Sequence, residues 1–389
     1  MIRRLPLLAV LVVLAACAAP EQPVPPPPEL RLEAVAFAEL DGWAGDDHAA
    51  ALDAFRISCA AIMKRNASEP MGGNLAMGRT GDWFEPCLVA AHTQGSEATT
   101  FFQTWFRPWV VLADTTAQGL FTGYYEPLLE GALQRGAENR YPVYGRPADM
   151  VVADLGLFAE DLAGRSVTGM IEGGKLVPYH DRGAIDGGAL DGKGLEIAWV
   201  SDPIALFFLH IQGSGRIGLA DGSELRVGYD GQNGRPYYAI GRELVAMGEL
   251  AEDEVSLQSI RAWLVAHPDE AGTVMATNAS YVFFRVLEGP GPLGAQGVPL
   301  TAGRSLAVDR DHIALGVPLW VDTTLADGTA WRRLMIAQDT GGAIDGPVRG
   351  DIFFGAGAEA EWQAGHLRSR GSYAVLLPHL VSDQLVASR

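Results

Sequence analysis

The spacing of apolar residues changes three times along this chain, and this pattern restricts the folds open to it more than any other feature. Helical spacing runs as far as Pro108, short strands with Asp-Gly pairs run from Gly119 to about residue 245, helical spacing returns near residue 255, and residues 300–377 are again rich in strands. Recurrence at every third or fourth position indicates helices, whereas alternation and Asp-Gly turns indicate hairpins. We therefore expect a small all-β segment inserted into a domain built from both ends of the chain.

The first residues have the features of an export signal. Arg3 and Arg4 precede an apolar run over residues 5–16, which is too short to span a membrane as a helix. The run ends at Cys17 in a Leu-Ala-Ala-Cys sequence that resembles a bacterial lipobox. This resemblance implies cleavage before Cys17 and a lipid on its thiol, and Ala18 favours the outer membrane. Residues 18–30 are rich in proline and predict an extended tether.

Composition excludes several classes of function. The net charge of −18 over 389 residues argues against nucleic acid and against docking on anionic lipid, so we expect membrane contact through the lipid anchor only. Cys59 and Cys87 fall on apolar stripes of expected helices, the first spanning residues 48–65. In an oxidising compartment they form either a disulfide or two unlinked core thiols. No Cys/His cluster has metal-ligand spacing, so no metal is expected.

Two carboxylates stand out near the C-terminus. Asp339 ends an apolar run that begins at Leu334, a glycine-rich turn follows, and Asp351 opens the apolar run Ile352 to Phe354. A carboxyl group packed against apolar side chains has a raised pKa, as a general acid near neutral pH requires. Turn aspartates also cap strands in proteins without any catalytic role. The residues alone leave both interpretations open.

Other motifs carry less weight. Residues 213–218 fit the G-x-G-x-x-G pattern, but a hairpin pattern follows instead of the helix that a dinucleotide site needs. Asp339-Thr340-Gly341 matches the aspartic-protease triplet, yet no second triplet is present to share a proton. Aromatic and amide side chains near glycines could line a sugar-binding cleft, although tyrosines are also common on sheet surfaces. These residues are Tyr124, Tyr125, Gln212, Tyr237 and Tyr238.

Five stretches in the same order resemble the membrane-bound lytic murein transglycosylase A (MltA) family. They are residues 121–127, 202–216, 234–242, 278–285, and 300–309 continuing to 355. The last stretch resembles the family's three-aspartate (3D) domain, whose acids match Asp309, Asp339 and Asp351. One departure is Ala314, where the family usually has proline.

The resemblance implies a mainly β fold with helices. It predicts a double-psi β-barrel formed by the N- and C-terminal segments, a smaller inserted β-barrel domain, and a groove for a glycan strand between them. We expect a signal peptide over 1–16, the anchor and tether over 17–30, the catalytic domain over 31–125 and 270–389, and the inserted β domain over 126–269, with a helix from about 253.

The resemblance also implies the reaction. The expected enzyme is a peptidoglycan lytic exotransglycosylase of the outer membrane, which cleaves between N-acetylmuramic acid and N-acetylglucosamine without cofactor and forms 1,6-anhydromuramoyl ends. Asp351 would be the single acid and base, with Asp339 beside it and Asp309 in a structural role. The substrate-binding residues expected are Tyr124, Tyr125, Gln212, Gly213, Ser214, Thr340 and Gly341. The alternative is a non-catalytic peptidoglycan-binding lipoprotein.

Overall fold

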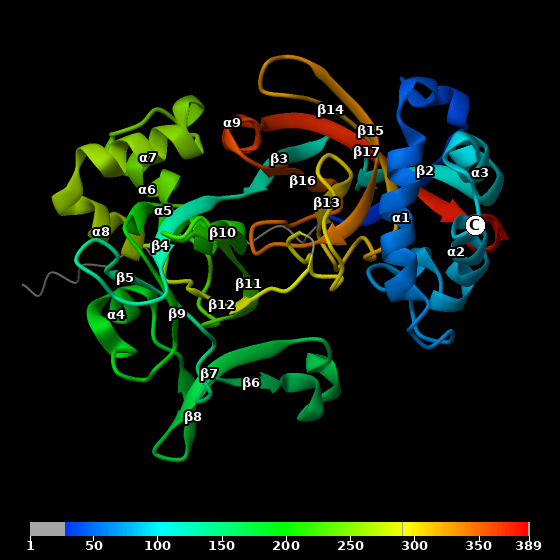
Figure 1. Ribbon diagram of the computed structural model, residues 1–389. Helices are drawn as coiled ribbons and strands as arrows, with labels where there is room; N and C mark the ends of the chain where they lie inside the picture. The colour runs from blue at the N-terminus through cyan, green and yellow to red at the C-terminus, as the bar shows by residue number, and fades with distance from the viewer. Residues whose placement is uncertain (1–27, 290, 388–389) are drawn as a thin grey trace, which may run out of the picture.

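The computed structural model describes residues 28–289 and 291–387. The expected signal peptide and the lipid-anchor residue Cys17 therefore lie outside the described residues. Within the described ranges, no helix has the length and apolar character needed to cross a membrane. Two β-rich parts lie on either side of strand β3 (Gly119–Glu126), which runs from one part to the other (Figure 1).

The first part is a sheet that closes on itself. Its strands besides β3 are β1 (Leu30–Ala34), β2 (Phe106–Ala113), β13 (Ser305–Val308), β14 (Pro318–Thr324), β15 (Ala330–Asp339), β16 (Arg349–Ala356) and β17 (Arg368–Pro378). The order is β1-β2-β17-β14-β15-β13-β16-β3, and β3 also pairs with β17. The strands from β17 to β3 thus form a closed ring, and closure leaves no free edge within it. We call this part the barrel.

Helices from both chain ends cover the barrel. They are α1 (His48–Ile62), α2 (Phe84–Ala90), α3 (Ala98–Trp105) and α10 (His379–Ala387). Helix α1 begins where the side chain of Asp47 accepts a hydrogen bond from the Ala50 N–H, and it buries its apolar stripe against β15. A disulfide joins Cys59 in α1 to Cys87 in α2. Helix α1 was expected over residues 48–65, and it ends slightly earlier, at Ile62.

The helix expected to run through Phe106 is shorter than predicted. Helix α3 ends at Trp105, and Phe106 begins β2. Pro108 does not stop a helix as expected but lies within β2, between β1 and β17. Proline keeps its carbonyl, and that of Pro108 accepts a hydrogen bond from the N–H of Val35. A position near the start of a strand tolerates the missing N–H.

The second part is built around another curved sheet. Its strands are β4 (Leu128–Ala132), β5 (Tyr141–Tyr144), β9 (Glu196–Val200), β10 (Ser214–Gly218), β11 (Glu224–Gln232) and β12 (Val282–Val286), in the order β12-β11-β10-β4-β9-β5. A bridge between Gly145 and Phe284 links its two edges. Because β12 pairs with β11, this sheet takes in residues as far as 286, beyond the boundary at 269 expected from the sequence. We call this part the inserted lobe.

A small third sheet projects from the inserted lobe (Figure 1). It consists of β6 (Val151–Asp154), β7 (Ser166–Glu172) and β8 (Lys175–Pro178). Of the expected Asp-Gly hairpins, Asp221 and Gly222 form the turn between β10 and β11. Asp230 and Gly231 instead form a bulge inside β11.

The prediction of an all-β segment over residues 119–245 is wrong, because α4 (Arg182–Ala184), α5 (Pro203–Gln212) and the start of α6 (Ile240–Met247) lie within it. The helices expected from about residue 255 are confirmed, as α7 (Leu257–Ala266) and α8 (Pro268–Ala276), while α9 (Ala358–His366) packs beside β3 and β16. The apolar run at 204–211 forms α5 because Asp202 caps the N–H groups of Ile204 and Ala205. Pro203 begins the helix, and Gly213 ends it with a positive φ.

Candidate active site

The two candidate acids are brought together by the short central strand β13. Asp339 of β15 and Asp351 of β16 are both register partners of Ala307, one on each side of it. Residues directly opposite one another in a ladder share a face of the sheet, so both carboxyl groups project on the side of the Ala307 methyl group. That side also carries the buried apolar residues Tyr124, Leu300, Ala307, Ile344 and Phe353, which form one cluster.

Asp351 is held by its neighbours on β3 and β16. Its register partner on β3 is Thr122, whose hydroxyl donates to Asp351 Oδ1 at 2.6 Å. Arg349 Nη2 in turn donates to the Thr122 hydroxyl at 2.8 Å. Burial raises the pKa of Asp351, and the opposing effects of the Arg349 charge and the Thr122 hydrogen bond do not cancel that rise. Asp351 is therefore a carboxyl group that retains its proton to higher pH than usual.

Asp339 has a different set of partners. Its Oδ1 accepts hydrogen bonds from the backbone N–H groups of Ala295 and Thr340, at 2.8 and 2.9 Å, and its Oδ2 accepts one from the Tyr124 hydroxyl at 2.9 Å. The segment that carries Ala295 can approach Asp339 this closely because residue 294 is glycine. A Cβ at Gly294 would collide with the carbonyl oxygen of Gln338. Burial raises the pKa of Asp339 to about 6 despite these hydrogen bonds, and the charge of Asp351 adds to the rise.

The inserted lobe contributes a tyrosine to this cluster. Tyr237 lies close enough to Gly342 that a Cβ there would be 3.9 Å from the Tyr237 Cβ. Burial, and then the negative charge of Asp351, raise the pKa of the Tyr237 hydroxyl. Tyr237 is nevertheless 37% exposed. The acids therefore lie where the lobe faces the barrel.

The structure places Asp309 and the residues after Asp339 at one rim of the same region. Asp309 Oδ2 accepts a hydrogen bond from the Gly346 N–H at 2.7 Å and so ties down the loop between the two acids. Thr340 and Asp309 line a cavity of about 680 Å³ that also touches Gly164 of the inserted lobe. Gly341 is exposed beside it.

The remaining expected substrate residues do not join the two acids. The ring of Tyr125 packs against Ala360 and Ala364 of α9, because consecutive residues of a strand point to opposite faces and Tyr124 occupies the other one. The side-chain oxygen of Gln212 accepts a hydrogen bond from the Tyr125 N–H at 3.0 Å. Gly213 ends α5, and Ser214 is buried at the start of β10. In this structure these residues anchor α5 to β3.

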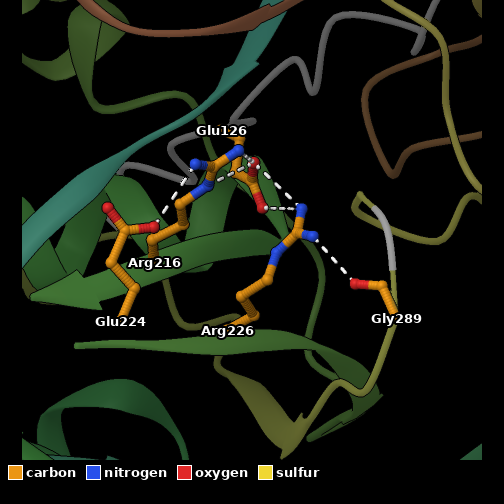
Figure 2. A network of polar contacts seen from close by, with 5 residues as sticks. All are labelled: Glu126, Arg216, Glu224, Arg226 and Gly289. Carbon is orange, nitrogen blue, oxygen red and sulfur yellow. Dashed lines mark hydrogen bonds and ion pairs between the residues drawn. The ribbon is translucent and has the colours of Figure 1, made fainter.

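The end of β3 is fixed to the inserted lobe by a buried charge network (Figure 2). Glu126 is 2% exposed and accepts hydrogen bonds from Arg216 at 2.8 Å and Arg226 at 2.9 Å. Arg226 also donates to the carbonyl oxygen of Gly289, where the chain leaves the lobe. Arg216 makes a further contact with Glu224. The network thus joins the strand that enters the lobe to the segment that leaves it.

Sequence reasoning missed two residues of the site, Thr122 and Arg349. Thr122 could have been found from strand alternation, because it precedes Tyr124 by two residues and so shares its face of β3. Nothing local identified Arg349, since its role depends on the parallel pairing of β16 with β3. In the described part of the chain, no group of three or more His, Cys, Asp or Glu side chains could hold a metal ion.

This arrangement can move protons to and from a bound ligand. Two carboxyl groups with raised pKa lie on one face, each fixed by hydrogen bonds to rigid strands or backbone. Such groups are suited to general acid and base chemistry near neutral pH. The partly exposed Tyr237 and the neighbouring cavity supply surfaces on which a sugar can pack.

Comparisons with known proteins agree with this architecture. Residues 120–285 match the family described as the MltA specific insert domain, and residues 304–377 match the 3D domain. Membrane-bound lytic murein transglycosylase A of Vibrio cholerae is 33% identical over 268 residues, which span 66% of this chain and 65% of that protein. These matches define a two-part protein of the lytic transglycosylase class.

Solved structures extend the likeness to most of the chain. The crystal structure of a membrane-bound lytic murein transglycosylase from Agrobacterium tumefaciens has a TM-score of 0.82 and 35% identity, with 91% of this chain and 99% of that chain covered. E. coli MltA with bound chitohexaose has a TM-score of 0.62 and 26% identity, with 91% and 93% covered. The chain belongs to the membrane-bound lytic murein transglycosylase A family.

Proposed function

We propose that this protein is a peptidoglycan lytic transglycosylase in which Asp351 is the single acid and base. The observation that carries the proposal is the buried, raised-pKa carboxyl group of Asp351 beside Asp339, on the face where barrel and lobe meet. Family membership supports it, as does the bound chitohexaose in the E. coli relative, an oligosaccharide of N-acetylglucosamine. A non-catalytic peptidoglycan-binding protein would not need such an acid.

The proposed reaction breaks the bond between N-acetylmuramic acid and N-acetylglucosamine. Protonated Asp351 donates its proton to the oxygen that links the two sugars, and the bond from that oxygen to muramoyl C1 breaks. The carboxylate then accepts the proton of the muramoyl C6 hydroxyl, whose oxygen bonds to C1. The products are a 1,6-anhydromuramoyl end and a free hydroxyl on N-acetylglucosamine, with no water consumed. Intramolecular attack needs only one positioned acid and base, in contrast to the carboxylate pair of ordinary glycosidases.

Neighbouring residues are assigned supporting roles. Thr122 orients Asp351 through its 2.6 Å hydrogen bond, and Arg349 fixes Thr122. Asp339 is assigned a supporting electrostatic role, because burial and the charge of Asp351 raise its pKa to about 6, and the same repulsion means that a charge on Asp339 opposes the ionisation of Asp351. Thr340 and Gly341 are assigned to the glycan surface, and Tyr124, which was expected there but is buried, is assigned to holding Asp339. Tyr125, Gln212, Gly213 and Ser214 are assigned to holding α5 against β3.

The finer fold and the location belong to the same proposal. The closed ring from β17 to β3 is proposed to be a double-psi β-barrel, and the inserted lobe a smaller barrel. We assign Cys17 as the lipidated residue that anchors the protein to the periplasmic face of the outer membrane, with residues 17–30 as tether.

Mass spectrometry of the fragments released from purified peptidoglycan tests the reaction and the acid together. We expect anhydromuramoyl ends from the wild type and none from Asp351→Asn, which keeps the shape of the side chain but cannot donate an acidic proton. Asp345→Asn is the matched control, because Asp345 is an exposed aspartate of the same loop region. Fragments with reducing ends would refute the intramolecular reaction. Anhydro ends from Asp351→Asn would refute the assignment of the acid.

A further inference from the structure

A second large cavity lies inside the inserted lobe, apart from the two acids. Its volume is about 870 Å³, and it is enclosed by the β4–β5 connection, β5, β9, α4, α5 and α8. Neither Asp339 nor Asp351 lines it, and neither does any other barrel residue. We propose that this cavity binds the peptide stem of peptidoglycan through its carboxylate groups. This inference rests on the proposed function for the identity of the ligand.

The inner wall of the cavity holds a buried cation without a contacting carboxylate. Arg182 is 2% exposed, and among the described residues no Asp or Glu lies within ion-pair distance of it, although Asp186 is near enough for its charge to act on the guanidinium. Three of its N–H groups are used, by the carbonyl oxygens of Asn278 and Ser280 and by His210 Nδ1 at 3.0 Å. A guanidinium has five N–H donors, so two remain for an acceptor. A buried cation in this state is complementary to an anion.

His210 adds a second unused donor to the same wall. Arginine can only donate, so His210 Nδ1 accepts from Arg182 and Nε2 carries the ring proton. Nε2 is buried and has no acceptor among the described residues. Burial, and then the charge of Arg182, lower the pKa of His210 well below its ordinary value, which keeps the ring neutral. The wall therefore has unused donors on two side chains, and the nearby carboxylate of Asp186 forms no hydrogen bond with either of them.

The mouth of the cavity also carries positively charged side chains, at the protein surface. Arg135 and Arg140 of the β4–β5 connection are exposed, and neither forms an ion pair with a described residue. The guanidinium of Arg135 lies over the ring of Trp199, 5.4 Å from its centroid, which restrains it at the rim. Two free arginines at one opening contrast with the net charge of −18 of the chain. An anionic ligand is drawn to this opening while the rest of the surface repels it.

The opposite side of the cavity selects among anions. Leu264, Ala271 and Met275 form an apolar wall, which suits a ligand with a short aliphatic body rather than inorganic phosphate. Asp186, on the side of Arg182, and Asp191, which accepts a hydrogen bond from the Tyr144 hydroxyl, also line the cavity and can receive an ammonium group. The ligand that fits has several carboxylates, an aliphatic body and one amine. Peptide stems of peptidoglycan have this composition, with γ-linked D-glutamate and a diamino acid.

Titration calorimetry with the tripeptide L-alanyl-γ-D-glutamyl-meso-diaminopimelate tests the proposal on the whole protein. We expect binding to the wild type and at least about tenfold weaker binding to Arg135→Gln/Arg140→Gln, because charge-assisted contacts are lost. The control is Lys175→Gln/Arg285→Gln, which removes two exposed, unpaired cations that line no described cavity. It should bind the tripeptide as the wild type does.

A second variant blocks the cavity without changing its charges. Gly272 of α8 is exposed and lines the cavity, and a Cβ there meets nothing within 4 Å, so the side chain of Gly272→Phe starts in open space at the cavity surface. It should also weaken tripeptide binding at least about tenfold, whereas the affinity of every variant for chitohexaose should remain that of the wild type. Absence of tripeptide binding, or equal binding by all variants, would overturn the proposal. Competition by acetate at the concentration at which the tripeptide itself binds would also overturn the proposal, because the site would then recognise any carboxylate and not the peptide.

These outcomes separate the inference from the proposed function. Release of anhydro ends from bare glycan strands by the wild type tests the reaction without any peptide present. If the strands are cut but the tripeptide does not bind, the peptide site is refuted and the reaction stands. If the tripeptide binds through Arg135 and Arg140 but no glycan is cut, the peptide site stands and the proposed reaction falls.

Discussion

Replacement of Asp339 by asparagine should change how the stability of the fold depends on pH. Burial raises the pKa of Asp339 from its ordinary value of 3.8 to about 6 in the folded state. Between these values the folded protein holds a proton that the unfolded chain has lost, so rising pH favours unfolding. The stabilisation is fully present below 3.8 and is lost as the pH rises through 6. The full gap corresponds to about 3 kcal/mol, at 1.36 kcal/mol per pH unit.

Denaturant unfolding at pH 4.5 and pH 7.5 measures most of this effect. Over that window the wild type should lose about 2 kcal/mol more stability than Asp339→Asn, because asparagine does not titrate. Because the charges of the two acids act on each other, the same comparison is made between Asp339→Asn/Asp351→Asn and Asp351→Asn, in which Asp351 does not titrate. Asp345→Asn serves as the matched control, since Asp345 is exposed, and its pH dependence should parallel that of the wild type. Equal pH dependence for Asp339→Asn and the wild type would refute the assignment of a buried, raised-pKa carboxyl group.

Three further changes test the contacts around the site. Thr122→Val removes a hydrogen bond that lowers the pKa of Asp351, so the alkaline limb of the pH profile of glycan cleavage should move to higher pH. Glu126→Gln leaves two arginines without their carboxylate and should cost about 1–3 kcal/mol of stability in denaturant unfolding, less than a fully buried pair because both arginines are partly exposed. Loss of the disulfide in Cys59→Ala/Cys87→Ala, with its sequence separation of 28, should cost about 3–4 kcal/mol in the same assay.

Each of these changes has its own contrary result. An alkaline limb that stays in place or moves to lower pH in Thr122→Val would show that the hydroxyl does not act on the acid. Glu224→Gln is the control for Glu126→Gln, because Glu224 is 42% exposed beside Arg216 and should contribute less than about 1 kcal/mol. Equal losses in the two variants would contradict the role of burial. Stability that is insensitive to the disulfide would show that α2 adds little to the fold.

Local signals predicted where the acids lie but not what brings them together. Alternation and glycine turns placed Asp339 and Asp351 at strand ends, since both signals act within a few residues. The pairing of each acid with Ala307 joins strands that are distant in sequence, so no local signal predicts it. The helical cap at Asp202 precedes an apolar run that fits a buried strand as well as a helix. For residues 204–211 periodicity does not decide between strand and helix, and the prediction of an all-β segment overlooked the Asp-Pro start and the glycine stop that mark α5.

The same limit explains the residues that differ from prediction. Tyr124 and Tyr125 looked equivalent in sequence, but a strand sends adjacent side chains to opposite faces, and only the pairing of β3 decides which face meets the acids. Pro108 carried a strong local signal against a helix, and that signal was correct. The strand that replaces the helix depends on β1 and β17, from the two ends of the chain.

The pairing of both acids with Ala307 has a consequence for how members of this architecture can diverge. The spacing between Asp339 and Asp351 is set by the two strand-to-strand distances across β13, so the segment that connects them in sequence does not determine it. Insertions, deletions and substitutions in that segment can reshape the glycan surface while the two acids keep their separation. The barrel therefore keeps the two acids in place while the segment between them varies. Substrate preference can evolve in that segment without a change in the position of either acid.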